Sequence, residues 1–254
     1  MMPTRVPLNN AVGNLRQIWH SPASLIFTAV ILVIQLWVTL VGGFNQQPAW
    51  SWFGTFGLTR EGFLSGKVWQ LITYAFLHGD WIHTGLNALF VLLIGSRIEH
   101  ISGRGLFLKT IIGGLVGGAL LHLVFAVSGE GATLLVGLSG GGMALLLLLT
   151  TLSPESRMMP LPVSGKNLGI GILAAELILM LANPALGISG FSNLGKILVQ
   201  HGMGSLFQIG HACHFGGGLV GWIMGRWILR PRITKKRLRR ERERQEAREI
   251  KRDV

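Results

Sequence analysis

The chain has 254 residues, of which 49% are hydrophobic and 13% are charged, and its mean hydropathy is +0.49. Soluble domains carry about a quarter charged residues, so this composition argues against a soluble enzyme and predicts a polytopic membrane protein. The net charge of +12 does not indicate nucleic-acid binding, because most basic residues lie in one terminal segment, from Arg230 to Arg252. A single cysteine, Cys213, excludes an intramolecular disulfide.

Six apolar stretches follow one another along the chain, and we interpret them as membrane spans. They cover residues 25–41, 82–98, 105–127, 139–152, 168–181 and 206–229. We interpret residues 42–67, which are rich in aromatic side chains, as an interfacial loop, and residues 183–205 as a glycine-containing loop. We therefore predict an all-α membrane protein with a six-transmembrane-helix bundle over residues 23–229. A short N-terminus (residues 1–22) and a basic tail (residues 230–254) flank this bundle.

An even number of spans puts both termini on one side of the membrane, and the basic residues indicate which side. The terminal side carries the tail together with Arg5, Arg16, Arg97, Arg104, Lys109, Arg157, Lys166 and Arg226. The opposite side carries only Arg60, Lys67 and Lys196. Because cytoplasmic loops are enriched in basic residues, we expect both termini to be cytoplasmic, in an integral protein of the bacterial cell (inner) membrane. The fourth span then begins on the extracytoplasmic side.

The fourth span begins with Ser139, which glycines flank at positions 137 and 140. Its run of about 14 residues measures ~21 Å as a helix, whereas the hydrocarbon core is ~30 Å thick. Ser139 is therefore expected roughly 10 Å below the outer surface. A packing patch of small residues and a serine that performs chemistry inside the membrane both fit this stretch.

A serine nucleophile needs a base, and the sixth span offers His214. His214 follows the start of that span by about eight residues, or ~12 Å, which matches the depth of Ser139. Gly217, Gly221 and Gly225 share its helical face, so we expect this face to pack closely against the fourth span. His211, one turn earlier, is interpreted as structural and is the second choice as base.

The second span offers two hydrogen-bond donors near its outer end. His83 and Asn87 are four residues apart, so they share one helical face, and both side chains can donate to an anion. Capping or packing would explain either residue alone. Together with a serine and a histidine at the same depth, they favour a site that stabilises an oxyanion.

These residues resemble the motifs of the rhomboid intramembrane serine proteases. The resemblance rests on Gly137-Leu138-Ser139-Gly140, on His214-x-x-Gly217-x-x-x-Gly221, and on the run from Trp69 through His78 and His83 to Asn87. It implies a Ser139–His214 dyad without a third carboxylate, with the Ser139 N–H, His83 and Asn87 around the oxyanion. It also implies single-span membrane proteins as substrates, and neither a cofactor nor a metal.

The chain departs from the resemblance at two positions. Gln70 follows Trp69 where the family commonly has arginine, and Met143 lies one turn after the serine where it tends to have an aromatic residue. A thioether can still make a soft contact with an imidazole. Two acidic residues are also notable. Glu99 is expected to be structural. Glu176, in the middle of the fifth span, is expected to face the bundle or to be protonated, and a role in substrate gating is a further alternative.

The basic tail interleaves arginine with glutamate, which favours a solvated helix. Its excess positive charge predicts an association with anionic lipid headgroups, although a topology signal alone would explain it equally well. Two other functions compete with a protease. One is a catalytically inactive rhomboid-like protein that binds membrane clients. The other is a transporter, which the absence of an inverted repeat in the sequence disfavours.

Overall fold

The computed structural model describes residues 17–44, 46–125, 134–158, 162–231 and 235–250. Within these ranges the secondary structure is helical, apart from two isolated β-bridges, Leu58–Leu135 and Arg157–Ser164. The predicted all-α class is therefore confirmed for the described residues. Most of the predicted N-terminus (residues 1–16) and the end of the predicted third span (residues 126–127) lie outside them.

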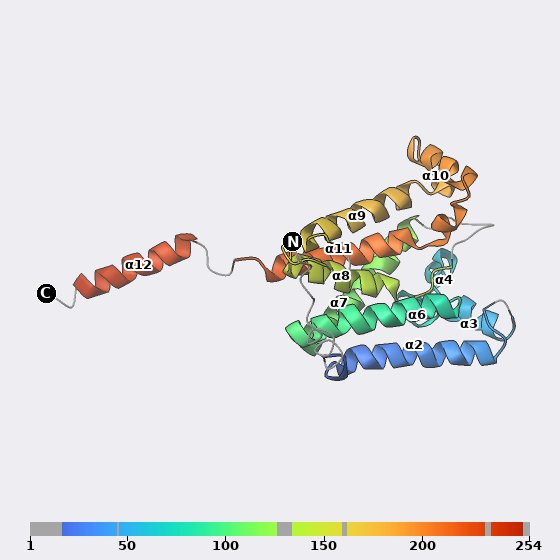
Figure 1. The fold of residues 1–254 in the computed structure, drawn as a ribbon, viewed down its shortest axis with the longest axis horizontal. Helices are drawn as coiled ribbons and strands as arrows, with labels where there is room; N and C mark the ends of the chain where they lie inside the picture. Colours follow the sequence, from blue (N-terminus) through green and yellow to red (C-terminus); the bar gives the residue numbers. More distant parts are fainter. Residues whose placement is uncertain (1–16, 45, 126–133, 159–161, 232–234, 251–254) are drawn as a thin grey trace, which may run out of the picture.

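The helices follow one another without a sheet between them (Figure 1). They are α2 (Pro22–Leu40), α3 (Ala49–Phe56), α4 (Arg60–Leu64), α5 (Gln70–Thr73), α6 (Trp81–Phe90), α7 (Ser96–Phe125), α8 (Ser139–Leu152), α9 (Gly165–Leu181), α10 (Phe191–Gln200), α11 (His211–Ile228) and α12 (Lys235–Ile250). Short 3₁₀ turns cover Tyr74–Phe76, Pro184–Leu186 and Gly204–Gln208, and a π turn, Val91–Gly95, joins α6 to α7.

Two helical stretches among the described residues are long and apolar enough to cross a membrane: Pro22–Leu40 and Trp81–Phe125. The second stretch has 45 residues and contains one non-helical residue, Gly103, whose φ is 81°. The polar connection that the sequence analysis placed at residues 97–104 is thus helical up to this glycine, which turns the chain back. Helix α8 is apolar but shorter.

Helices α7, α8 and α11 pack against one another through glycines, as the stripe on the sixth span predicted. A Cβ atom at Gly217 would overlap with the carbonyl oxygen of Gly140, and one at Gly221 would overlap with that of Ala144. On α7, a Cβ at Gly114 would overlap with the Ala144 side chain. Only glycine allows these backbones to come so close, so the expected contact between the fourth and sixth spans is confirmed.

Two regions that the sequence analysis treated as loops contain helices. Residues 42–67 include α3 and α4, and residues 183–205 include α10. The last helix of the bundle also starts later than predicted, because residues 204–208 form a 3₁₀ turn and α11 begins after Gly210. Apolar residues occur both in the 3₁₀ turn at residues 204–208 and in α11, so hydropathy did not distinguish the turn from the helix.

The N-terminus of α2 is held by a carboxylate from α7. Glu99 is 6% exposed and accepts hydrogen bonds from the backbone N–H groups of Ala23 (3.1 Å) and Ser24 (2.9 Å) and from the Ser24 hydroxyl (3.1 Å). A negative charge there satisfies first-turn donors and complements the helix dipole. Arg104 pairs with the same carboxylate at 3.6 Å. The expectation that Glu99 is structural agrees with these contacts.

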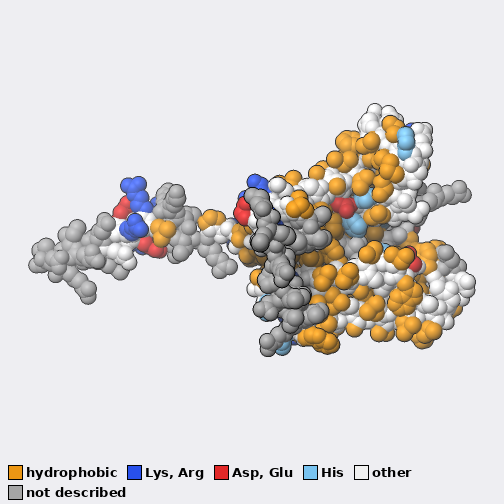
Figure 2. Space-filling view, viewed as in Figure 1, with side chains coloured by type: hydrophobic (Ala, Val, Ile, Leu, Met, Phe, Trp, Pro, Cys, Tyr) orange, Lys and Arg blue, Asp and Glu red, His pale blue; other side chains and the backbone are white. Residues whose placement is uncertain are grey.

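Large apolar side chains cover the outside of the helical body. Exposed residues of this kind include Ile26, Val33, Leu36 and Trp37 on α2, Leu89 on α6, and Trp222, Ile223 and Trp227 on α11. Figure 2 shows this apolar surface, with the Lys and Arg side chains gathered toward the end from which α12 extends. Contiguous apolar surface of this extent indicates contact with lipid rather than water.

Candidate active site

Ser139 is the first residue of α8, and the chain reaches it through a glycine in the left-handed region. Gly137 has a φ of 111°, and a Cβ atom there would lie 2.7 Å from Nε2 of His83. Glycine is therefore required both for the turn and for the histidine ring beside it. This turn presents the serine hydroxyl at the N-terminal end of α8, where the backbone N–H groups of the first turn have no partner within the helix.

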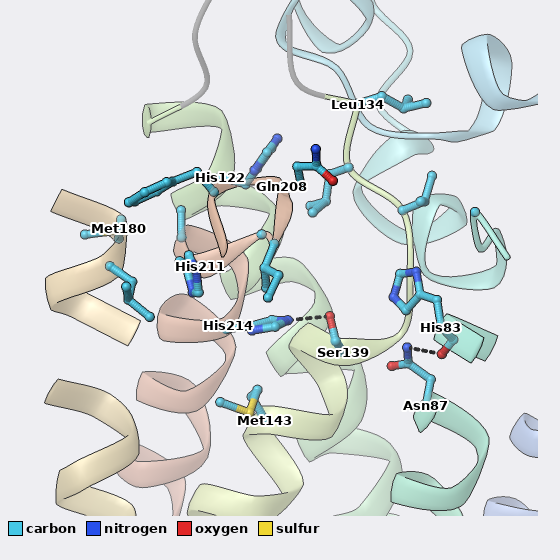
Figure 3. Close-up of a pocket in the computed structure, with 18 of the residues that line it drawn as sticks. His83, Asn87, His122, Leu134, Ser139, Met143, Met180, Gln208, His211 and His214 are labelled. Atoms are coloured by element: carbon cyan, nitrogen blue, oxygen red, sulfur yellow. Dashed lines mark hydrogen bonds between the residues drawn. The ribbon is translucent and has the colours of Figure 1, made fainter. Parts of the chain in front are cut away.

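His214, the fourth residue of α11, faces this hydroxyl across the glycine-packed interface (Figure 3). Its Nε2 lies 2.8 Å from Oγ of Ser139, within hydrogen-bond distance. The structure thus brings together the two residues that the sequence analysis paired. The position of His214 along its helix differs from the prediction. Because α11 begins at His211, His214 is the fourth residue of the helix rather than about eight residues from its start.

His83 and Asn87 lie on α6, on the opposite side of Ser139 from His214 (Figure 3). Asp80 caps this helix by accepting a hydrogen bond from the backbone N–H of His83 at 2.7 Å, which fixes where the first turn begins. The Asn87 amide donates to the His83 carbonyl at 3.0 Å. Both side chains line the same cavity as Ser139, so the structure brings all four predicted site residues to one place.

This cavity has a volume of about 720 Å³ and lies between α6, α8, α9, α11 and the segment before Ser139. Apolar side chains make up most of its lining, and the polar side chains of His83, Asn87 and His214 lie around Ser139, whereas His122 and Gln208 lie farther along the cavity (Figure 3). Met143 lies one turn below the serine, next to His214 (Figure 3). A cavity with an apolar wall and a few convergent polar groups is typical of a binding or active site.

A carboxylate that the sequence analysis did not connect to the site contacts the histidine from behind. Glu176 on α9 lies with Oε1 3.2 Å from Nδ1 of His214 and with Oε2 2.6 Å from Nδ1 of His211. The expectation that Glu176 faces the bundle agrees with this position. The i, i+3 spacing of the two histidines was a signal that they share a helical face, but it did not reveal the acid on another helix.

His78 is a second residue that the sequence analysis did not assign to the site. Its imidazole is fully buried, packs edge-on against His83 with ring centroids 4.9 Å apart, and has no hydrogen-bond partner at either nitrogen among the described residues. Burial, and then the neighbouring His83, lowers the pKa of His78 to about 3. His78 therefore stays neutral and acts as a packing residue behind His83.

The side chain of Cys213 points away from the site, as expected. Its thiol is buried and lies 3.5 Å from the Tyr74 hydroxyl, which in turn donates to the Leu115 carbonyl at 2.9 Å. The side chain packs between α7 and α8 rather than in the cavity. A thiol buried in this way is not placed to act as a nucleophile.

One group of described residues has the composition of a metal site. Glu176, His211 and His214 each offer a ligand atom, and these atoms lie within 4.8 Å of one another. The same atoms, however, make the direct hydrogen bonds from the two imidazoles to the carboxylate, and these contacts account for their arrangement without an ion.

Comparison with known proteins gives one family. Residues 65–231 match the Rhomboid domain. The chain is 30% identical over 173 residues to "RHOMBOID-like protein 12, mitochondrial" of Arabidopsis thaliana, an alignment that covers 61% of this chain and 50% of the relative. It is 28% identical over 167 residues to "Rhomboid-like protein 11, chloroplastic" of the same plant, covering 63% and 52%. It is 37% identical over 82 residues to human "Rhomboid-related protein 3", covering 32% and 19%. The chain thus spans about half the length of each of the two plant relatives and 19% of the length of the human one.

Proposed function

Since the chain belongs to the rhomboid family, we propose that it is an intramembrane serine endopeptidase that cleaves peptide bonds in or near transmembrane segments of other membrane proteins. The observation that carries the proposal is the 2.8 Å contact between Ser139 Oγ and His214 Nε2 at the wall of the cavity. A hydroxyl that donates to an imidazole is the arrangement in which a serine becomes nucleophilic.

The chemistry follows from the roles of these groups. His214 Nε2 accepts the proton of Ser139 as Oγ attacks the scissile carbonyl, and the proton then passes to the leaving amine. Water, deprotonated by the same nitrogen, hydrolyses the acyl-enzyme. The negative charge on the carbonyl oxygen is stabilised by the Ser139 backbone N–H at the start of α8 and by the side chains of His83 and Asn87, which come from the other side of the cavity.

The proposal includes six spans with both termini in the cytoplasm. The charge asymmetry of the connecting segments supports this orientation, and it puts the N-terminus of α8 toward the extracytoplasmic side. Single-span membrane proteins are the proposed substrates, and their helix must unwind because its hydrogen bonds shield the carbonyl groups from attack. Cysteines introduced at Gly54 and Asn193, both exposed, should react with impermeant reagents only from the extracytoplasmic side. Reaction only from the cytoplasm would contradict the topology.

The experiment is a cleavage assay of the purified protein in detergent with a panel of single-span membrane proteins. We expect the wild-type protein to cut at least one member between two defined residues, and Ser139→Ala to leave every member intact while folding normally. Cleavage by Ser139→Ala at the wild-type rate would contradict a serine mechanism. Binding of a panel member without cleavage by the wild-type protein would instead identify an inactive client-binding relative.

A further inference from the structure

The ionisable side chains on the α9 side of the cavity form a continuous hydrogen-bonded line. From Glu176 the line runs through His214 to Ser139, with 3.2 Å between Oε1 and Nδ1 and 2.8 Å between Nε2 and Oγ. Glu176 also contacts His211 at 2.6 Å. The side chains of Glu176 and His214 are only 16% and 17% exposed, and that of His211 is 7% exposed. A dyad of serine and histidine leaves Glu176 and His211 unexplained.

The contacts restrict where the protons can be. Nε2 of His211 lies 2.9 Å from the Leu206 carbonyl, which only accepts, so this nitrogen carries a hydrogen. Nδ1 of His211 and Oε2 of Glu176 must then share one further proton, either as imidazolium and carboxylate or as imidazole and carboxylic acid. In both forms the pair is neutral overall, which lowers the cost of keeping it inside the membrane.

His214 has a single tautomer that fits its neighbours. Oε1 of Glu176 accepts in either form of the pair, so Nδ1 of His214 carries the hydrogen and donates it. Nε2 is then free to accept from the Ser139 hydroxyl, as a base must. Met143 alone would not fix the plane of the ring, because a flexible thioether restrains little, whereas hydrogen bonds at both nitrogens do.

We propose that Glu176 is a positioning residue of this site, which makes the dyad the reactive part of a Ser139–His214–Glu176 triad. Glu176 holds His214 in the tautomer with hydrogen on Nδ1 and stabilises the positive charge that His214 gains when it takes the serine proton. The Nδ1 hydrogen stays on His214 throughout, and the transferred proton leaves from Nε2 to the amine product. His211 orients the carboxylate through its other oxygen and offsets its charge at rest.

This inference rests on the proposed function, and it is tested by steady-state kinetics on a substrate that the wild-type protein cleaves. Glu176→Gln keeps the size and one acceptor oxygen of the side chain but removes the charge. We expect kcat to fall about 10- to 100-fold, at or below the low end of the ~10²- to 10⁴-fold that general-base assistance contributes, because His214 itself remains, and KM to stay within about twofold. Glu176→Asp, which restores the charge at a shorter reach, should recover part of kcat. Glu99→Gln is the matched control, because it neutralises a buried carboxylate that does not contact the site.

The outcomes separate the two proposals. A merely structural role for Glu176 would lower the thermal midpoint of Glu176→Gln without a selective loss of kcat in the folded protein, and that result would overturn the inference. So would a kcat within twofold of wild type, or an equal loss in Glu176→Gln and Glu176→Asp. If the wild-type protein cleaves nothing and its serine does not react, the proposed function fails first, and the triad fails with it.

Discussion

Two carboxylates, the buried Glu99 and the partly buried Glu176, serve opposite ends of this bundle with different partners. Glu99 accepts from backbone N–H groups at the start of α2, which never change their protonation. Glu176 instead contacts two imidazoles, each of which can gain or lose a proton. The first arrangement ties two helices together, whereas the second couples a carboxylate to the group that faces Ser139.

The difference shows that burial of an acid within an apolar helix does not by itself indicate catalysis. An acid in a membrane segment needs partners, and their chemistry decides what it does. Backbone donors at a helix N-terminus give stability, because the charge complements the dipole. Imidazole donors beside a nucleophile give control over a proton. Four predictions can break or sharpen this comparison.

The largest effect on stability is expected at the Glu99 end. Glu99→Leu should lower the free energy of unfolding by at least about 4 kcal/mol, because it removes the acceptor of three buried hydrogen bonds, each worth about 1.5–3 kcal/mol when the acceptor is charged. The exposed Arg104 pair adds little to this. Thermal unfolding in detergent measures the loss. An unchanged midpoint, or a selective loss of kcat in the folded protein, would contradict the division between the two acids.

Substitutions at the end of the bundle that holds Ser139, called the reactive end below, should change activity rather than stability. Asn87→Ala should reduce kcat by about 10²-fold, the loss expected when one donor to an oxyanion is removed, while KM changes little. His83→Ala should cause a similar loss. Thr84→Ala, on the same helix but with its hydroxyl on the Asp80 carbonyl, is the matched control. If neither His83→Ala nor Asn87→Ala changed kcat, the oxyanion assignment would be wrong.

His78 gives the reactive end a pH-dependent stability. Its pKa is about 3 in the folded protein against 6.5 for an ordinary histidine. As the pH falls, the unfolded chain therefore binds a proton at this imidazole at a higher pH than the folded protein does. The stability due to this group is present above pH 6.5 and falls between pH 6.5 and 3, by about 2 kcal/mol at pH 5. The thermal midpoint should therefore drop less from pH 7 to pH 5 in His78→Gln than in the wild-type protein. His201→Gln, at an exposed site, should drop as the wild type does. Equal drops in all three proteins would show that His78 does not control this dependence.

The smallest effect is expected from the tail, which belongs to neither end. Helix α12 is charged and exposed where its side chains are described, with Arg239 and Glu243 paired at 3.1 Å. A protein that ends after Arg232 should cleave in detergent within about twofold of the full chain, since α12 extends away from the other helices (Figure 1). Binding to vesicles that contain anionic lipid should weaken, because each basic residue near the surface contributes about 1 kcal/mol. A loss of activity above tenfold with an intact fold would assign the tail a further role.

Much of this architecture could be predicted because the sequence signals lie within single helices, either in the spacing of residues on one face or in the rise along the helix axis. Helical rise placed Ser139 and His214 at similar depth, and the glycine stripe from Gly217 to Gly225 indicated which faces meet. Rise does not determine how helices are arranged around one another. The contact between Glu176 and His214 depends on where α9 lies beside α11, and that of His78 with His83 depends on a turn between two segments.

The boundaries were harder to predict for a related physical reason. Residues 204–210 are apolar enough to continue the last span, yet they turn before α11 begins at His211. Residues 191–200 were expected to be a loop, but α10 forms there with an apolar face. Hydropathy reports where a segment prefers to lie, whereas its backbone geometry depends on its packing partners.

The most direct test of the central claim is the reaction of the purified protein with a fluorophosphonate, followed by mass spectrometry of its peptides. We expect one adduct, on Ser139, to form in the wild-type protein and to be absent from Ser139→Ala. Its formation should slow by at least about 10³-fold in His214→Ala, because the hydroxyl then lacks its base. An adduct on another residue, or labelling of Ser139 at the same rate without His214, would contradict the claim that these two residues form the reactive centre.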